Sequence, residues 1–598
     1  MEFLLFLGSD PAPMTNRSLL LLLTSLLLLS ACKRDAEPRQ TFVEIRARLA
    51  ADPDRIHPML STSGYASEVI KLIHFPLLEY HPITLELEPL IAGSLPVETP
   101  IDTGTLAGGT AYSYTIRPEA VWDDGTPITG ADYIFTLKAA LNPLVKANAW
   151  RGYLSFIHDV VLDPTDPRRF TVLTAERYFL AMPATGNLNL YPAHIYDPHG
   201  LLTDIPLTDL TNPETAEQLA ETEPRLAEFA AQFSQDRYSR DTSFVQGAGP
   251  YRLARWDAGQ EIVLERKSPW WGDQLAGQGD QFTAKPDRIR YKIIADEQAA
   301  LTLLQDGGLD VVGELTPAAF TAMQADSVDQ TVFGTWLPVY MQYYYLALNN
   351  HHPKFQDVRV RRALAHCLDL DLGIQSILSG LGERIIGPFH PSKPYYNRSI
   401  QPVPYDPAKA RSLLAEAGWT DTNGNGTVDK ELNGKRVELQ LTLLLAAGSE
   451  IGRDIGLLLQ QGARQAGIEV ILESREFKLI LGDMASGNYE MTALRPRKGP
   501  ADDDPYQSWH SDSDTPGGTN RVGYRSQVAD SLIMAIRSTT DLAQRYDLYR
   551  AFQVQLAKDQ PVIFLYAPKE PVIVRKAITG MQASPMRPGY YLPFLSHQ

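Results

Sequence analysis

The order of apolar and polar side chains along the chain predicts an alternation of strands and helices. Between residues 437 and 443, apolar side chains alternate with Glu, Gln and Thr, which is the pattern of a strand with one buried face. Residues 450–466 have helical spacing, and Gly467 leads from them into a second apolar run at 468–472. Together these segments predict a β-α-β unit.

Helix signals recur along the chain. The segment 406–418 begins with Asp-Pro, carries an apolar stripe and ends at a glycine, which predicts a helix of about three turns. Residues 357–368 have apolar side chains three and four apart, and Cys367 belongs to that face, so we interpret its thiol as a packing group. A third amphipathic segment, 541–558, precedes a short apolar strand. The pattern indicates a large mixed α/β protein.

The first 40 residues have a different pattern. An apolar run at 19–29 follows Arg17 and precedes Ser-Ala-Cys, which is the layout of a secretory signal peptide. The run is too short to span a bilayer, which argues against an N-terminal anchor helix. Met14 looks like a more conventional start than Met1.

The tetrapeptide LSAC that ends at Cys32 resembles the bacterial lipobox, in which the cysteine is acylated and becomes the new N-terminus. That resemblance implies a lipoprotein signal peptide at 1–31 and acyl chains such as palmitate on Cys32. Multiple acyl chains hold a protein stably on a membrane. The charged residues at 32–40 are expected to form a flexible tether. A plain signal peptide with an incidental cysteine is the alternative.

Composition and charge narrow the function classes. The 598 residues are 44% hydrophobic and 21% charged, enough apolar material for more than one core. The net charge is −16 with the acidic residues scattered, so a nucleic-acid partner is not expected. Only 2 cysteines are present, and one of them is in the leader, which excludes a disulfide framework and a cysteine-based zinc site.

The sequence YSYTIRPEAVWDDGTPITGAD at 112–132 resembles the signature of the oligopeptide-, dipeptide- and nickel-binding proteins, the family 5 extracellular solute-binding proteins of bacterial ABC importers. Its DDGTP run forms a turn, and Thr129 with Asp132 predicts the N-terminus of a helix, so the motif is scaffolding and not a ligand site. Further matches follow in the family's order: GAGPY at 247–251, WWG at 270–272, ADE at 295–297, LDV at 309–311, FQDVRVR at 355–361 and the segment 406–419.

The resemblance implies the fold. It is an α/β, two-lobed, periplasmic-binding-protein-like fold (type II, cluster C), with an extra subdomain on the first lobe and two crossing strands between the lobes. The order of the motifs divides the chain into discontinuous domains. The expected boundaries are 41–56, 188–293 and 560–598 for lobe I, 57–187 for the extra subdomain and 294–559 for lobe II.

The resemblance also implies the function. We expect a monomeric, extracytoplasmic binding lipoprotein, in the periplasm or at the cell surface, that captures peptides by hinge closure and delivers them to a membrane permease. It would be no enzyme and would need no cofactor. Oligosaccharides, opines and metal chelates are alternative cargoes. Two other functions stay open: an envelope hydrolase that uses the acids at 502–504, and a signalling receptor that reports peptides to a membrane sensor.

Ligand contacts are implied by the same resemblance. In peptide-binding relatives an acidic residue four positions before a proline pairs with the peptide ammonium, but that position is Ala501 here. Asp502 or Asp503 would take its place after a small loop shift, and a charge-assisted hydrogen bond would result. Arg495 and Arg497 precede this loop and are candidates for the ligand carboxylate.

Aromatic side chains complete the expected site. Tyr65, Tyr153 and Trp509 lie in segments that line the cleft in relatives, where flat rings hold a peptide backbone or sugar. No metal site is expected, because the pair His351-His352 precedes a proline in a loop and is interpreted as solvated. The Asp- and Gly-rich run at 421–429 imitates a calcium loop but lacks the glutamate at its twelfth position.

Overall fold

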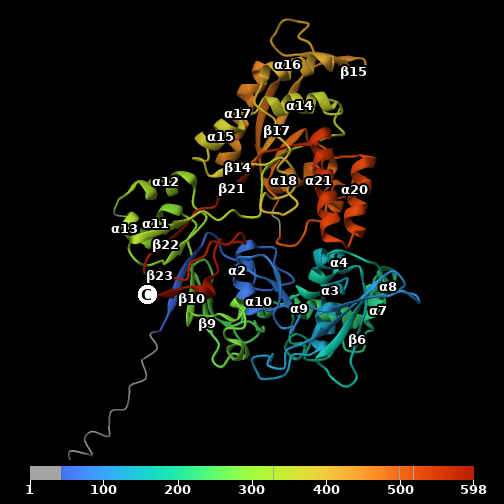
Figure 1. Ribbon diagram of the computed structural model, residues 1–598, viewed down its shortest axis with the longest axis vertical. Helices are drawn as coiled ribbons and strands as arrows, with labels where there is room; N and C mark the ends of the chain where they lie inside the picture. The colour runs from blue at the N-terminus through green and yellow to red at the C-terminus, as the bar shows by residue number, and fades with distance from the viewer. Residues whose placement is uncertain (1–41, 328, 497–498, 516–517) are drawn as a thin grey trace, which may run out of the picture. The chain divides into compact units, whose positions relative to one another are not determined.

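Two large β-sheets organise the chain, and each is built from segments that are far apart in the sequence (Figure 1). The computed structural model describes residues 42–327, 329–496, 499–515 and 518–598. Residues 43–598 form one compact unit, which is described here by itself. Among the residues described, no helix combines the length and the apolar character needed to cross a membrane.

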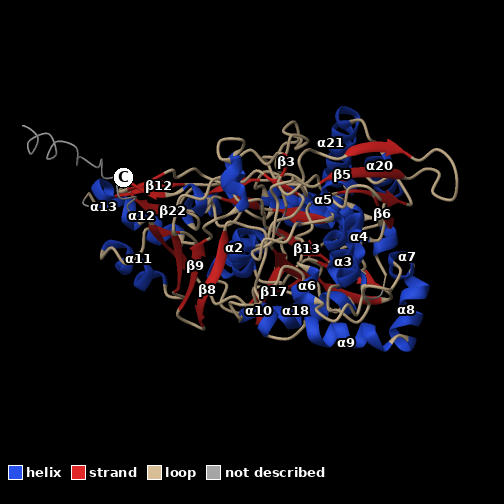
Figure 2. Cartoon of the chain, turned by 90° about the horizontal axis from the view of Figure 1, so that it is seen from below, coloured by secondary structure: helices blue, strands red, loops and turns tan. Residues whose placement is uncertain are grey.

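The first sheet has seven strands around the parallel pair β1 and β10. Its order is β12 (Phe333–Trp336), β22 (Val572–Arg575), β11 (Val311–Val312), β1 (Glu44–Leu49), β10 (Arg288–Ile293), β9 (Glu261–Arg266) and β8 (Tyr251–Asp257). One face packs against α2 (Gly64–Ile73), whose Ala66, Val69 and Ile73 are fully buried. In both ribbon views α11 (Glu297–Gln305), α12 (Pro317–Ala325) and α13 (Asp329–Val332) gather around β22 and β12 (Figures 1 and 2).

The second sheet has five strands and contains the β-α-β unit predicted from the sequence. Its order is β18 (Glu469–Arg475), β17 (Gln440–Ala446), β19 (Met491–Leu494), β13 (Tyr345–Leu348) and β20 (Val562–Phe564). The helix α17 (Glu450–Gln465) joins the parallel strands β17 and β18. The predicted strand at 437–443 is divided, because β16 (Lys435–Glu438) ends before β17 begins and pairs instead with β15 (Asp429–Leu432).

The other predicted helices are also present. Asp406 caps α16 (Pro407–Glu416) by accepting a hydrogen bond from the backbone N–H of Lys409 at 2.8 Å. In α14 (Val358–His366) the apolar face is buried, and Cys367 follows it as a buried cap whose thiol donates to the carbonyl of Ala363. Two long helices, α20 (Gln527–Ser538) and α21 (Leu542–Asp559), lie side by side (Figure 1).

A four-stranded antiparallel sheet forms the region of the expected extra subdomain. Its order is β4 (Val97–Pro100), β5 (Thr110–Thr115), β7 (Arg169–Thr174) and β6 (Ile157–Leu162), covered by α3 (Gly130–Leu141). The backbone N–H of Thr129 donates to Asp132 at 2.9 Å, which fixes the start of α3 as the motif predicted.

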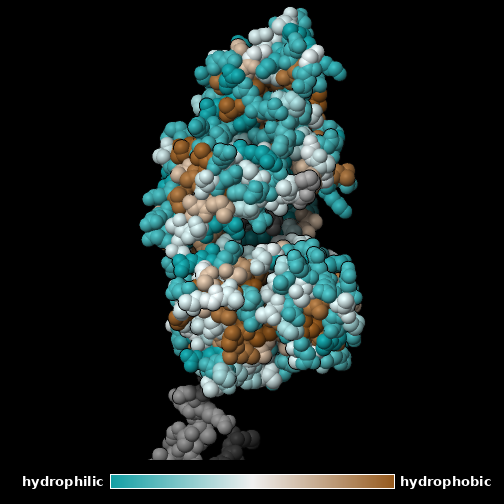
Figure 3. Space-filling view, turned by 90° about the vertical axis from the view of Figure 1, so that its right-hand side faces the viewer, coloured by the Kyte–Doolittle hydropathy of each residue, from teal (hydrophilic) through white to brown (hydrophobic). Residues whose placement is uncertain are grey.

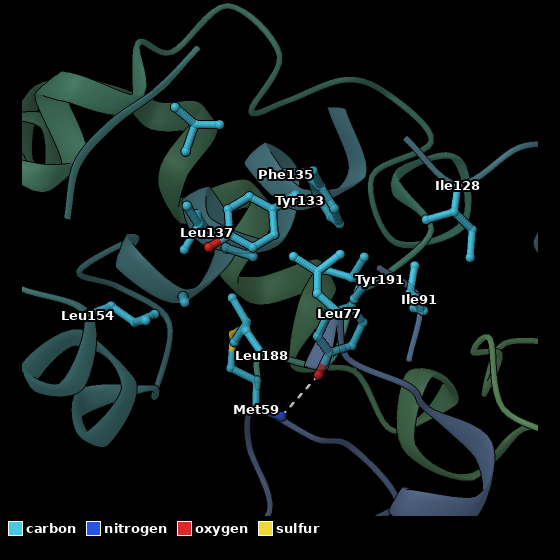
Figure 4. Close-up of a cluster of buried hydrophobic side chains, with 14 of the residues drawn as sticks. Met59, Leu77, Ile91, Ile128, Tyr133, Phe135, Leu137, Leu154, Leu188 and Tyr191 are labelled. Atoms are coloured by element: carbon cyan, nitrogen blue, oxygen red, sulfur yellow. Dashed lines mark hydrogen bonds between the residues drawn. The ribbon is translucent and has the colours of Figure 1, made fainter. Parts of the chain in front are cut away.

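The core of this subdomain reaches beyond the expected boundary at residue 187. Leu137, Leu188 and Tyr191 belong to one buried cluster, in which the hydroxyl of Tyr191 accepts a hydrogen bond from the backbone N–H of Met59 at 2.9 Å (Figure 4). Helix α9 (Pro224–Phe233) also buries its aromatic side chains in this cluster. Residues 188–233 therefore pack with the subdomain and not with the seven-stranded sheet.

Two further boundaries differ from those expected. Strands β11 and β12 lie between residues 294 and 559 but belong to the seven-stranded sheet, and β20 lies after residue 559 but belongs to the five-stranded sheet. A strand joins the sheet that offers it hydrogen-bonding partners, and those partners are hundreds of residues away. Local pattern does not contain that information.

Most of the surface that Figure 3 shows is polar, with apolar side chains in separate patches. Isolated patches of this kind are normal for a folded protein.

The residues that pack around the five-stranded sheet, which we call the five-stranded half, contain a close contact between α17 and the end of α14. This contact can be tested by substitution. Gly462 of α17 is buried, and a Cβ atom there would collide with the carbonyl oxygen of Cys367. Because the collision is with backbone, we expect Gly462→Ala to lower the free energy of unfolding by about 1–3 kcal/mol. In α18 (Phe477–Ser486), Gly482→Ala is the matched control, because its Cβ would meet open space and would add up to about 1 kcal/mol of helix stability. Urea unfolding followed by circular dichroism measures both, and equal effects would contradict the close contact.

Candidate functional site

The chain crosses between the two large sheets twice, and the two crossing segments pair with each other. One crossing runs from β12 to β13 and the other from β21 (Tyr566–Pro568) to β22. Val339 and Lys569 form an antiparallel bridge, and the backbone N–H of Glu570 donates to the carbonyl of Pro338 at 3.0 Å. We call these residues, 337–344 and 569–571, the crossing segments. They match the two crossing strands that the sequence resemblance implied.

A cavity of about 830 Å³ lies against the crossing segments. Its lining includes α2 and residues 314–317 from the side of the seven-stranded sheet, and Leu378, Ile451 and Arg495 from the side of the five-stranded sheet. The subdomain region contributes Trp150. A ligand in this cavity would contact groups on both sides of the crossing segments.

A buried ionic network forms the wall on the side of the seven-stranded sheet. The guanidinium of Arg587 is 2.6 Å from Glu68 and 2.6 Å from Glu314, and it stacks over the ring of Tyr65 at 4.2 Å. The hydroxyl of Tyr65 donates to Glu314 at 3.0 Å. Burial raises the pKa of Glu68 to about 7, although Arg587 opposes the rise. Two carboxylates thus share one guanidinium at the cavity.

Lys71 and Glu79 extend this network along the wall. The ammonium of Lys71 donates to the carbonyl of Arg587 at 3.0 Å, and burial lowers its pKa. Glu79 accepts hydrogen bonds from the backbone N–H of Tyr80 at 2.8 Å and from Asn187 at 2.9 Å. Burial raises the pKa of Glu79, because these neutral donors compensate only part of its lost hydration.

The crossing segments carry a second carboxylate site. Gln342 donates to Glu570 at 2.6 Å, and both side chains line the cavity. Burial raises the pKa of Glu570, the charge of Arg495 opposes the rise, and the charge of Glu314 adds to it. Arg495 lies across the cavity wall over the ring of Tyr344 at 5.7 Å and donates to its hydroxyl at 3.2 Å. Arg495 is exposed, so a ligand can reach its guanidinium.

The expected aromatic residues are divided between the cavity and the cores. Tyr65 lines the cavity. Tyr153 is not among the described lining residues, but its ring packs edge-on against Trp150, which does line the cavity. Trp509 is buried among Tyr524 and Phe564 in a core of the five-stranded half, which differs from the expectation that it faces the cleft. The remaining aromatic side chains of the lining are Phe75, Tyr80, Tyr340, Tyr344, Tyr566 and Tyr591.

The acidic loop is placed differently from the sequence expectation. Neither Asp502 nor Asp503 is among the described residues that line the cavity. Asp502 is 3.1 Å from the guanidinium of Arg545, and Asp503 accepts a hydrogen bond from the hydroxyl of Tyr395 at 2.9 Å. These partners come from other parts of the chain, so the loop sequence alone did not reveal them. Both carboxylates therefore have a partner that is not among the described lining residues of the cavity.

The same loop joins the five-stranded half to the subdomain. Asp504 accepts a hydrogen bond from the hydroxyl of Tyr178 at 3.2 Å and is 3.1 Å from the guanidinium of Arg537. The guanidinium of Arg537 also lies over the ring of Tyr178 at 5.4 Å, and that of Arg545 lies over the ring of Phe179 at 5.0 Å. These contacts, which we call the loop–subdomain contact, hold two distant segments together beside the cavity.

Of the remaining sequence candidates, two are not described by the structure, and the two histidines are not among the described lining residues of the cavity. Arg497 and Cys32 lie outside the described residues. His351 is 2.9 Å from Asp514 and His352 is 3.4 Å from Glu490, so each histidine has a carboxylate neighbour of its own. Within the described part of the chain, no group of three or more His, Cys, Asp or Glu side chains is arranged to hold a metal ion.

Sequence reasoning missed the network around Arg587. Glu68, Glu314 and Arg587 are separated by hundreds of positions and lie in no motif, so nothing local marked them. One signal was available in principle, because Glu314 closely follows the matched LDV run, where the chain leaves a strand of the sheet. Ligands in α/β sheets bind at the carboxyl ends of strands.

Comparison with known proteins assigns this arrangement to a family. The family described as bacterial extracellular solute-binding proteins, family 5 Middle, matches residues 86–518. The oligopeptide-binding protein AppA of Bacillus subtilis is 27% identical over 493 residues, which are 81% of this chain and 80% of AppA.

Solved structures with the same fold bind different solutes. The structure of AppA from Bacillus subtilis in complex with a nonapeptide has a TM-score of 0.68 and 23% identity, and the match covers 93% of this chain and 99% of AppA. NikA from Brucella suis in complex with Fe(III)-EDTA has a TM-score of 0.72 and 18% identity, and the match covers 93% of this chain and 100% of NikA. At these identities the structures establish the two-lobed fold.

The loop–subdomain contact can be tested by removing Arg545. This side chain is buried, and Arg545→Met would leave Asp502 without its guanidinium and remove the contact with Phe179. We expect the free energy of unfolding to fall by about 2–4 kcal/mol, because an uncompensated buried charge remains. Arg550→Met, in the same helix, removes a more exposed ion pair with Asp547 and should cost less than about 1 kcal/mol. Urea unfolding of the two variants measures the difference, and a smaller loss for Arg545→Met would refute the assignment.

Proposed function

The chain belongs to the bacterial extracellular solute-binding proteins of family 5, and on this premise we propose that it is the peptide-capturing receptor of an ABC importer. The observation that carries the proposal is the cavity against the crossing segments, which is lined from both large sheets. A ligand that contacts both sides stabilises the state in which they approach, and two short crossing segments permit that motion. Capture in this way needs no bond to be made or broken.

Peptide is the cargo that the cavity chemistry favours. The volume of about 830 Å³ lies in the range of small-molecule sites, about 300–1,000 Å³. Aromatic rings such as Tyr65 and Trp150 offer flat surfaces to a peptide backbone, and the ring of Tyr153 packs edge-on against Trp150. Arg495 offers a guanidinium that can bind a terminal carboxylate with two hydrogen bonds. AppA, a relative of this chain, is an oligopeptide-binding protein, and its structure holds a nonapeptide.

We further propose that the receptor acts outside the cytoplasm, attached to a membrane by acyl chains on Cys32. The apolar run and the lipobox-like tetrapeptide support this anchor. An anchored receptor stays close to its permease, which would recognise the closed state and accept the peptide. Anchoring through 32–40 would leave the cavity-bearing unit free to reorient.

The class of cargo can be tested directly. The exported full-length protein, purified in detergent and stripped of bound solute by refolding, should show a melting temperature higher by a few degrees with an equimolar library of tri- to hexapeptides. Mass spectrometry of the library should show no cleavage. If only oligosaccharides, opines or metal chelates raise the melting temperature, the protein is still a binding receptor but peptide is the wrong cargo. Cleavage of the peptides would favour the hydrolase alternative.

The proposed binding of the peptide carboxylate by Arg495 can be tested by substitution. We expect Arg495→Leu to weaken binding of free-carboxylate peptides about 10-fold or more and to leave their C-terminal amides unaffected, because a charge-assisted pair is lost. Arg453→Leu, an exposed arginine of α17 outside the cavity lining, is the matched control. Calorimetric titration of acids and amides separates the cases, and equal losses for both would exclude carboxylate recognition by Arg495.

The anchor is tested by Cys32→Ser. Without a thiol no acyl chain can be attached, so we expect the protein to leave the membrane fraction and to lose labelling by radioactive palmitate. Ser30→Ala keeps a small residue in the tetrapeptide and should remain attached. A Cys32→Ser protein that stays in the membrane fraction would show that another segment holds it there.

A further inference from the structure

The cavity needs a partner for the amino group of its solute, and the acidic loop does not supply one. Asp502 and Asp504 are paired with Arg545 and Arg537, and Asp503 with Tyr395. None of the three is among the described residues that line the cavity. These three carboxylates therefore differ from the glutamates of the cavity, which belong to its described lining.

The cavity itself has an excess of carboxylates. Its described lining includes five glutamates, with Lys71, Arg495, Lys569 and Arg587 as the lysine and arginine residues. Around Arg587, two cations, Arg587 and Lys71, compensate three glutamates, which are Glu68, Glu79 and Glu314. Glu68 is 3% exposed and belongs to the wall, whereas the side chain of Glu314 is 27% exposed and can be reached from the cavity.

Glu314 is held in place from several directions. It follows β11, at the carboxyl end of a strand that runs parallel to β1. Its carbonyl accepts a hydrogen bond from Arg48 at 3.3 Å, and its carboxylate accepts one from the hydroxyl of Tyr65 at 3.0 Å. Its φ angle of 56° is in the left-handed region, which a non-glycine residue adopts only when its surroundings enforce it. The carboxylate is therefore pre-organised, which lowers the entropic cost of binding.

Glu570 completes the arrangement from the crossing segment. Glu570 and Glu314 line the same cavity, and Gln342 holds the Glu570 carboxylate there at 2.6 Å. The charge of Glu314 adds to the rise in the pKa of Glu570, and the charges of Arg495 and Arg587 oppose it. If a peptide carboxylate binds Arg495, as proposed above, it neutralises part of the positive charge that stabilises the Glu570 carboxylate. A positive group of the solute near Glu314 and Glu570 would restore it.

We propose that Glu314 and Glu570 bind the ammonium group of the solute, so that the amino-terminal anchor lies on the seven-stranded sheet and the crossing segment instead of the acidic loop. This inference rests on the proposed peptide receptor and names the group that the receptor selects. An ammonium donates hydrogen bonds to carboxylates more strongly than a neutral amide does, above all where water is excluded. Because Glu570 is part of a crossing segment, binding there acts directly on the backbone that connects the two sheets.

The test compares two versions of one library, tri- to hexapeptides with free amino termini and the same peptides N-acetylated, on the exported full-length protein in detergent. Native mass spectrometry and calorimetric titration give the affinities. Wild type should prefer the free amines, and Glu314→Gln should weaken their binding about 10- to 100-fold while changing the acetylated peptides little. Glu570→Gln should act in the same direction. Asp502→Asn is the matched control and should retain the wild-type preference.

The outcomes separate this inference from the function on which it rests. Free-amine binding that is unchanged in both Glu314→Gln and Glu570→Gln, or a preference lost in Asp502→Asn, would overturn the ammonium site and leave a peptide receptor intact. Wild type that binds neither library would overturn the peptide receptor and this site with it. Melting curves without peptide identify any variant that fails to fold. If one glutamate variant fails, the peptide affinities of the other variant decide whether the ammonium site exists.

Discussion

The structure depends on the antiparallel contact between the two crossing segments. The bridge between Val339 and Lys569, with the hydrogen bond from Glu570 to Pro338, connects two sheets that otherwise have separate cores. Every other feature of the site is arranged around this contact, because the cavity lies against it and takes its lining from both sides. A connection of two short segments can bend with small changes in a few backbone angles, whereas the packed sheets cannot. Residues such as Gln342 and Glu570 are therefore at once part of the connection and part of the cavity wall.

Charged side chains form two separate groups near the cavity, and the two groups have different roles. The acids of the loop at 502–504 are engaged with Arg545, Tyr395, Arg537 and Tyr178, so their role is to join the five-stranded half to the subdomain. Around Arg587 the compensation is incomplete, because the two cations Arg587 and Lys71 serve three glutamates, Glu68, Glu79 and Glu314. Buried carboxylates with too few cations keep raised pKa values, as Glu68, Glu79 and Glu570 do. A positively charged solute group is favoured at the place where compensation is incomplete.

Local sequence was a reliable guide wherever neighbours in the chain create the structure. The cap of α16 by Asp406, the start of α3 at Thr129 and the β-α-β unit around α17 all arise from side chains within a few positions of one another. The burial of Cys367 followed from spacing alone, although the residue caps the end of α14. The motif order identified the family and the fold, and the family model matches residues 86–518, the stretch in which those motifs lie.

The sequence by itself thus determined the class of protein and its principal elements. Only the tertiary structure decided that β11 and β12 join the first sheet, that Trp509 is a core residue, and that Asp502 and Asp503 have partners elsewhere. The physical reason is the same in each case. Strand pairing, burial and ion pairing are contacts between residues distant in the chain, and Glu68, Glu314 and Arg587 meet only because the sheet brings its carboxyl ends and the C-terminal segment to one place.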